Sequence, residues 1–137
     1  MSDYTPIVDA ILKALPDIAE KVPEGMTAGL KFTSPTQTTH GGFPWPNPGE
    51  WTPEVSEDDF NPETCTSGGY HAALTIVAAG SGGHRYTHAM LVAWYPDEAG
   101  QPDEDGKVKA RRILSVARID IAACVRTGAL SGADLNR

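Results

Sequence analysis

The sequence predicts an α+β fold, with a small antiparallel sheet, an N-terminal amphipathic helix and a short C-terminal helix. Three observations support this class. Apolar residues recur at helical spacing between residues 7 and 22, residues 85–95 are rich in β-forming apolar side chains, and Asp105-Gly106 is typical of a hairpin turn. The length of 137 residues fits one domain with a core of its own.

The N-terminal helix is predicted from its first residues and from its apolar spacing. Thr5-Pro6 can open a helix, because the hydroxyl caps an N–H group and proline has none to leave unpaired. Pro16 predicts a kink or two short helices that meet there. We expect a helical segment over 1–25 and a single α+β domain over 26–137. The apolar face consists of Ile7, Val8, Ile11, Leu12, Leu15, Ile18, Ala19 and Val22.

The middle of the chain contains the expected strands. Residues 29–33 alternate apolar and polar side chains, as a strand does, and a second strand could lie near 50–55. Residues 69–79 form a buried strand that leads into a short helix, although periodicity alone does not decide between the two. Residues 85–95 are the strongest strand candidate.

Residues 107–119 are expected to follow the Asp105-Gly106 turn as the antiparallel partner of that strand. Val108, Ala110, Leu114 and Val116 share one parity, and we expect them on one face. Because Arg112 breaks this parity, we predict a β-bulge near Arg111-Arg112. A last short helix follows, with Asp120 as its N-cap and Gly128 at its C-terminal end.

Composition limits the possible partners and compartments. The formal charge of −7 argues against general binding to nucleic acid or to an anionic membrane. Cys65 and Cys124 are too few for a disulfide framework and indicate reduced thiols. The N-terminus lacks the features of a signal peptide, and no apolar run has the length of a membrane span. We therefore expect a soluble cytoplasmic protein.

Histidines supply the candidate metal ligands. His84 and His88 are four residues apart, and His71 lies earlier in the chain. The pair falls at the start of a predicted strand, with neither an HExxH motif nor a cysteine pair, so we predict no metal and no cofactor. His71, His84 and His88 remain the candidate ligands should a metal bind. Cys65 precedes His71 by six residues, but no third residue to orient such a pair is evident, and we assign no catalytic residue.

Two groups of residues are candidates for protein contacts. The loop between residues 34 and 62 is rich in proline and glycine, and its aromatic side chains either fix the loop to the body or bind a partner. The basic strand either forms an anion-binding patch or, as we favour, a solvated outer face that discourages aggregation. The aromatic candidates are Phe43, Trp45 and Trp51, and the basic candidates are Lys107, Lys109, Arg111 and Arg112, followed on the same strand by Arg118.

The C-terminal tail falls into five-residue units. Ala133–Arg137 is a full copy of the A(D/N)LXX unit of pentapeptide-repeat proteins, and Gly128–Gly132 is a looser one. Most of 28–137 is similar to the leader domains that precede such repeats in actinobacteria and their phages. The resemblance implies a lineage and no activity. The units here are too few to stack into a solenoid, so we expect the tail to follow the last helix. The resembling segments are 30–46, 65–73, 78–83, the strand that ends at Trp94-Tyr95, and 103–116.

These observations favour a non-enzymatic interaction or accessory domain of actinobacterial or phage type. Its partner would be another protein or a second copy of the chain, and not nucleic acid or a membrane. One alternative is a phage virion structural protein, such as a capsid accessory subunit, which an exposed apolar stripe on helix 7–22 would favour. The other is a small enzyme, which convergence of His71, His84 and His88 in one pocket would favour. The expected location is the cytoplasm, or the virion for a structural protein.

Overall fold

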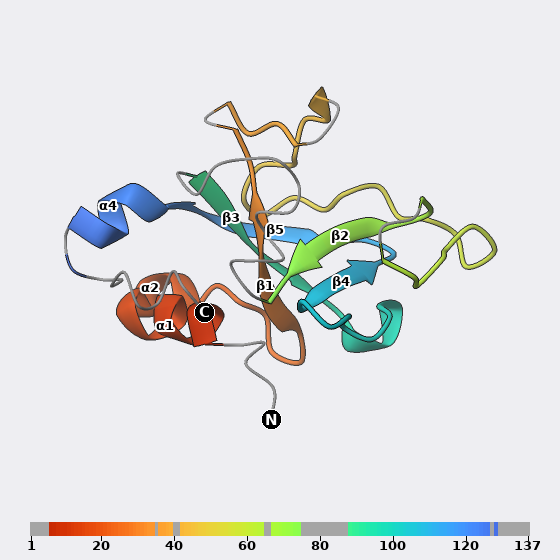
Figure 1. The fold of residues 1–137 in the computed structure, drawn as a ribbon, viewed down its shortest axis with the longest axis horizontal. Coiled ribbons are helices and arrows are strands. Elements are labelled where there is room, and N and C mark those ends of the chain that lie inside the picture. Colours follow the sequence, from red (N-terminus) through yellow and green to blue (C-terminus); the bar gives the residue numbers. More distant parts are fainter. Residues whose placement is uncertain are drawn as a thin grey trace.

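The structure is a computed structural model that describes residues 6–34, 36–39, 42–64, 67–74, 88–126 and 128. Within this part of the chain, short helices and an antiparallel sheet confirm the α+β class (Figure 1). In chain order, the elements are α1 (Pro6–Ala14), α2 (Pro16–Ala19), β1 (Thr27–Phe32), β2 (Tyr70–Ala73), β3 (His88–Trp94), the 3₁₀ turn η2 (Pro96–Glu98), β4 (Lys107–Ala110), β5 (Leu114–Asp120) and α4 (Ile121–Arg126).

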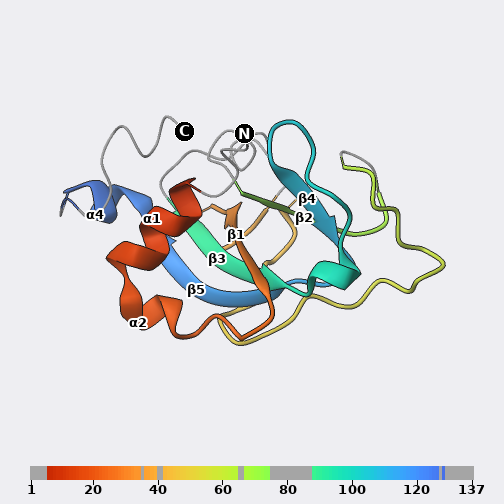
Figure 2. The same ribbon diagram turned by 90° about the horizontal axis from the view of Figure 1, so that it is seen from below.

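The described strands form one sheet in the order β4-β2-β1-β3-β5, and every neighbouring pair is antiparallel. β3 pairs along its length with both β1 and β5, and β5 forms one edge of the sheet. The α-helices gather at one end of the molecule, and β2 and β4 lie toward the other (Figures 1 and 2).

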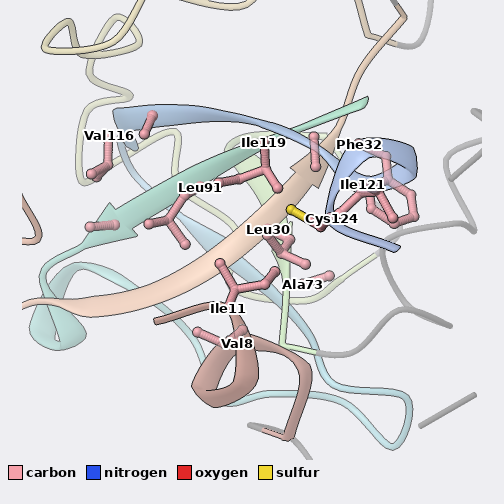
Figure 3. Packing of buried hydrophobic residues seen from close by; sticks show 13 residues of the cluster. Val8, Ile11, Leu30, Phe32, Ala73, Leu91, Val116, Ile119, Ile121 and Cys124 are labelled. Atoms are coloured by element: carbon pink, nitrogen blue, oxygen red, sulfur yellow. The ribbon is translucent and has the colours of Figure 1, made fainter. Parts of the chain in front are cut away.

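Both faces of the sheet are covered by buried apolar residues. On the helix side, Val8 and Ile11 of α1 are 3% and 0% exposed and pack with Leu30 and Leu91 (Figure 3). Cys124 of α4 lies in the same cluster. The apolar stripe of the N-terminal helix is therefore used inside the fold. The opposite face buries Trp45, Ala72, Leu74, Met90, Val92, Trp94, Val108, Ala110 and Ile113.

The ends of the helices agree with the sequence signals. Helix α1 ends at Ala14 and α2 begins at Pro16, as the proline predicts. The Asp120 carboxylate accepts a hydrogen bond from the Ala123 N–H at 2.9 Å, which confirms the predicted N-cap of α4. Gly128 has a φ of 81°, the left-handed conformation expected just beyond a helix. The five-residue units beyond Gly128 lie outside the described residues.

The prediction of one strand over 107–119 paired with 85–95 is wrong in its first half. Residues 107–110 form β4, which pairs with β2, and only β5 pairs with β3. The chain breaks between them because Arg111 donates its backbone N–H to the Glu98 carbonyl, outside the β2–β4 ladder. As a result, Val108 and Ala110 lie in one core cluster, whereas Leu114 and Val116 pack with the other. The sheet irregularity lies further on, between Leu91 and Val92, opposite Val116.

The Asp105-Gly106 turn forms, but with a different first arm. Asp103 accepts backbone hydrogen bonds from Asp105 and Lys107, each at 2.9 Å, and Gly106 has a φ of 89°. The turn joins β4 to the segment just before it, which bridges β4 at Ala99 and Ala110. The hairpin signal is correct about the turn and wrong about its partner.

The possible strand near 50–55 is reduced to a single bridge between Trp51 and Leu114. This segment covers the first part of the β5 edge, where the Gly49 N–H donates to the Ser115 carbonyl and the Ser115 N–H to the Glu50 carbonyl. The short helix expected after β2 lies outside the described residues. Within the described part of the chain, no helix combines the length and apolarity that a membrane crossing requires.

Candidate functional site

A loop over residues 34–47, called here the 34–47 loop, folds back on itself beside β1 and β5. Its described arms are joined by backbone bonds from Thr39 N–H to the Phe43 carbonyl and from Trp45 N–H to the Gln37 carbonyl, each at 2.9 Å. Hydroxyl contacts brace the base of the loop, since the oxygens of Ser34 and Thr38 lie 2.6 Å apart. The loop is therefore held by its own hydrogen bonds.

Gln37 is the hub of this loop. Its φ of 64° is in the left-handed region, which a residue with a Cβ rarely adopts. Its amide nitrogen donates to the Trp45 carbonyl at 2.7 Å and to Asn47 Oδ1 at 3.0 Å. Its amide oxygen accepts from Nε of Arg118. An unfavourable backbone conformation is thus retained where one side chain connects three parts of the structure.

Arg118 extends from β5 to this hub. Besides the bond from Nε to Gln37, its Nη2 donates to Asn47 Oδ1 at 2.8 Å. Both acceptors are neutral amides, and Nη1 has no acceptor among the described residues. The side chain is exposed and borders two hollows.

The two hollows differ in charge. The first, of about 260 Å³, is lined by Asp120 and His88 as well as by Arg118, and Met90 lies on its apolar side. The second, of about 380 Å³, has no acidic residue in its lining and is called here the Arg118 hollow. Its lining consists of Thr36, Gln37, Pro44, Trp45, Asn47 and Arg118.

Three aromatic rings lie beside this hollow and contact one another. They belong to Phe43, Trp45 and Tyr70 and are called here the aromatic cluster. Phe43 contacts Trp45 with ring centroids 6.1 Å apart, and Tyr70 lies 6.2 Å from Phe43 and 6.3 Å from Trp45. Trp45 is 4% exposed, whereas Phe43 is 38% exposed. The Lys31 ammonium lies 5.2 Å from the Trp45 ring centroid, and burial together with the Lys107 charge lowers the pKa of Lys31 to about 8. Two of the aromatic candidates named from the sequence are therefore in contact. Trp45 is buried, and Phe43 is exposed.

The third aromatic candidate lies in a separate cluster. Trp51 stacks on Tyr95 with ring centroids 5.9 Å apart, and the Arg112 guanidinium lies 4.3 Å from the Trp51 ring. Arg112 also binds both carboxylate oxygens of Glu98, at 3.0 and 3.3 Å. This arrangement fixes the segment before β5 to the turn after β3, because each group already has a partner within the chain.

The basic strand does not form one solvated face, which corrects our expectation. Lys109 is 0% exposed, and its ammonium donates to the carbonyls of Glu63, at 3.3 Å, and Ser67. Arg111 pairs with Glu54 at 3.1 Å and with Glu57 at 3.6 Å. Arg112 is paired with Glu98, and Lys107 is partly buried.

Two of the three histidine candidates lie on opposite faces of the sheet. His71 shares its face with Ala73 on the helix side, and His88 shares its face with Met90 on the other. Burial and the charges of Lys31, Lys109 and Lys107 lower the pKa of His71 to about 4. His84 and Cys65 lie outside the described residues. In the part of the chain that the structure describes, no three His, Cys, Asp or Glu residues are grouped so that they could hold a metal ion.

Comparison with protein-family models, with curated proteins and with solved structures finds no match for this chain. The resemblance to leader domains of pentapeptide-repeat proteins therefore stays a prediction, and the candidate site depends on geometry alone.

Sequence reasoning missed Gln37 and Asn47 and placed Arg118 only within a basic strand. No local motif marks Gln37, whose role follows from contacts with residues up to 81 positions away. The sequence carries no signal that separates Arg118 from the other basic residues of the predicted strand.

Proposed function

We propose that this chain is a non-enzymatic interaction domain, and that it contacts a protein partner through Phe43, which buried Trp45 supports, and through the adjoining Arg118 hollow. The observation that carries the proposal is Phe43. This ring is 38% exposed, and it contacts the rings of Trp45 and Tyr70. An aromatic anchor on a pre-formed loop next to a hollow is typical of the centre of a protein contact, because little side-chain freedom is lost on binding.

The other residues named from the sequence support this choice of surface. Arg111 and Arg112 are paired with carboxylates of the same chain, and Lys109 is buried. A partner would have to break these contacts to use them. The virion alternative also needs a surface other than the apolar stripe of α1, since Val8 and Ile11 are buried.

The test is selection from a displayed library of random peptides, followed by affinity measurements on single variants. Phe43→Ala is expected to weaken the selected peptides at least about tenfold, as loss of an aromatic anchor does. Tyr95→Ala is the matched control, because Tyr95 is 37% exposed and lies in the separate Trp51 cluster, and it should leave binding unchanged. Failure to enrich any peptide, or equal affinity for Phe43→Ala and the wild type, would contradict the proposal.

A further inference from the structure

We propose that the Arg118 hollow binds a single carboxylate group carried on an apolar residue, of the kind found at the C-terminus of a protein chain. The inference deepens the proposed function, on which it rests, by naming the group that a partner would place beside Phe43. It follows from the charge of the hollow, from the way Arg118 is held, and from the apolar wall.

Arg118 forms no ion pair within the described part of the chain. Arg111 and Arg112 each have carboxylates within 4 Å, whereas Arg118 has none among the described residues. The chain carries 18 acidic residues against 11 lysines and arginines, so carboxylates are not scarce. Instead, the two groups that bind the guanidinium are amides, which fix its position and leave its charge in place.

The hydrogen bonds also determine which side of the guanidinium is available. Nε and Nη2 donate to Gln37 and Asn47, and these acceptors are themselves joined through the Gln37 amide nitrogen. Nη1 and the remaining N–H of Nη2 stay available on the end of the planar fork. This pair of donors matches the two oxygens of a carboxylate.

The local charge suits one carboxylate better than a polyanion. Arg118 is the cation in the lining of the hollow, and the chain as a whole carries −7. A nucleic acid or an anionic membrane would meet net repulsion around this one contact. Thr36 is a further polar residue in the lining, and its hydroxyl oxygen lies 3.0 Å from that of Ser34.

One part of the wall beside the cation is apolar, and the other lining residues are polar. Exposed Pro44 and the largely buried Trp45 belong to the lining of the hollow, and exposed Phe43 lies against Trp45. A volume of about 380 Å³ is large enough for one residue with its terminal carboxylate. A ligand with a carboxylate at one end and an apolar side chain at the other satisfies both halves of the site.

The experiment titrates the ¹⁵N-labelled chain with N-acetyl-leucine, N-acetyl-leucinamide and isovalerate, and follows the backbone amides of Gln37, Trp45 and Asn47. N-acetyl-leucine is expected to shift these signals saturably, with a dissociation constant of roughly 1–10 mM, whereas the amide does not. If isovalerate binds more weakly than N-acetyl-leucine, the result supports the C-terminus of a protein chain as the ligand. If the two bind with equal affinity, the result supports a small organic acid as the source of the carboxylate. Equal shifts from the acid and its amide would overturn the proposal.

Variants assign the effect to Arg118. Arg118→Gln is expected to abolish the saturable shift, and Arg118→Lys to weaken binding at least about threefold because the planar fork is lost. Arg126→Gln removes the same charge from an exposed position in α4 and should bind as the wild type does. Should Arg118→Gln fail to fold, the lysine variant decides, since wild-type affinity in it would refute the role of the fork.

The failure of this inference is distinguishable from that of the proposed function. Phe43→Ala should retain N-acetyl-leucine binding, because the Phe43 side chain does not line the hollow. Loss of peptide binding in that variant together with retained carboxylate binding supports both proposals. Peptides that depend on Phe43, with no response to any carboxylate, would overturn the carboxylate inference alone.

Discussion

Gln37 offers the most informative perturbation, because its backbone and its side chain act on stability in opposite directions. Its φ of 64° is strained for any residue with a Cβ, whereas its amide makes hydrogen bonds to Trp45, Asn47 and Arg118. Gln37→Ala removes the hydrogen bonds and keeps the strain. Gln37→Gly removes both, and the two variants together separate the two effects.

The expected magnitudes follow from these contacts. The side-chain bonds lie near the surface and contribute about 0.5 kcal/mol each, so Gln37→Ala should lower the free energy of unfolding by about 1.5 kcal/mol. Glycine relieves about 1–2 kcal/mol of left-handed strain but adds about 0.5–1 kcal/mol of entropy to the unfolded chain. Gln37→Gly should therefore be more stable than Gln37→Ala by about 0.5–1 kcal/mol.

The assay is urea unfolding followed by tryptophan fluorescence, with equal m-values as the condition for comparing the variants. Both variants should also free Nε of Arg118, which keeps its bond from Nη2 to Asn47, and weaken N-acetyl-leucine binding. A Gln37→Ala variant as stable as the wild type would refute the role of the hub. A glycine variant less stable than the alanine variant would refute the strain.

Further predictions test the sheet, the buried histidine and the last helix by the same unfolding assay. Gly29→Ala should cost at least about 2 kcal/mol, because a Cβ there would lie 2.6 Å from the Trp94 ring and 2.8 Å from a backbone carbonyl, and a neutral result would contradict this packing. His71 has a folded pKa of about 4 against 6.5, so the unfolded chain binds more protons between these values and stability falls as pH drops from 6.5 to 4. Because the ring is partly exposed, the loss is about 1 kcal/mol, and His71→Gln should flatten the profile; an unchanged profile would exclude His71 as its source. Asp120→Ala should cost about 1 kcal/mol through loss of the α4 cap, whereas Asp120→Asn should retain most of it.

The parts of the fold that sequence predicts are those set by neighbouring residues. Pro16 divides the N-terminal helix because it lacks an N–H, and Asp120 caps α4 because its carboxylate reaches the Ala123 N–H. The strand over 85–95 follows from its own composition, and β3 occupies residues 88–94 of it. Each of these features depends on contacts within a few residues.

The pairing of β4 could not be predicted in the same way. Its partner β2 has only four residues and lies 34 positions or more earlier in the chain. The break before β5 is stabilised by ion pairs of Arg111 with Glu54 and of Arg112 with Glu98. No local pattern at Arg111-Arg112 contains these distant carboxylates, so parity alone suggested a bulge.

In the candidate site, too, the sequence predicts the local features and misses those that depend on distant residues. Phe43 and Trp45 stand out from the sequence as aromatics in a proline-rich loop, and they do meet in space. The composition of the basic strand gave no reason to separate Arg118 from Arg111, yet only Arg111 has a carboxylate partner among the described residues. The distinction depends on Gln37, whose side chain reaches Arg118 only in the folded chain.

The most direct test of this account is the side-chain Nε–H signal of Arg118 in a ¹H–¹⁵N spectrum at neutral pH. If Gln37 holds the guanidinium, the signal is protected from solvent exchange and resolved from the other arginines in the free protein. Addition of N-acetyl-leucine should shift it saturably, whereas the amide should not. An Nε–H signal that exchanges as in an unstructured arginine, or that responds equally to acid and amide, would contradict the account.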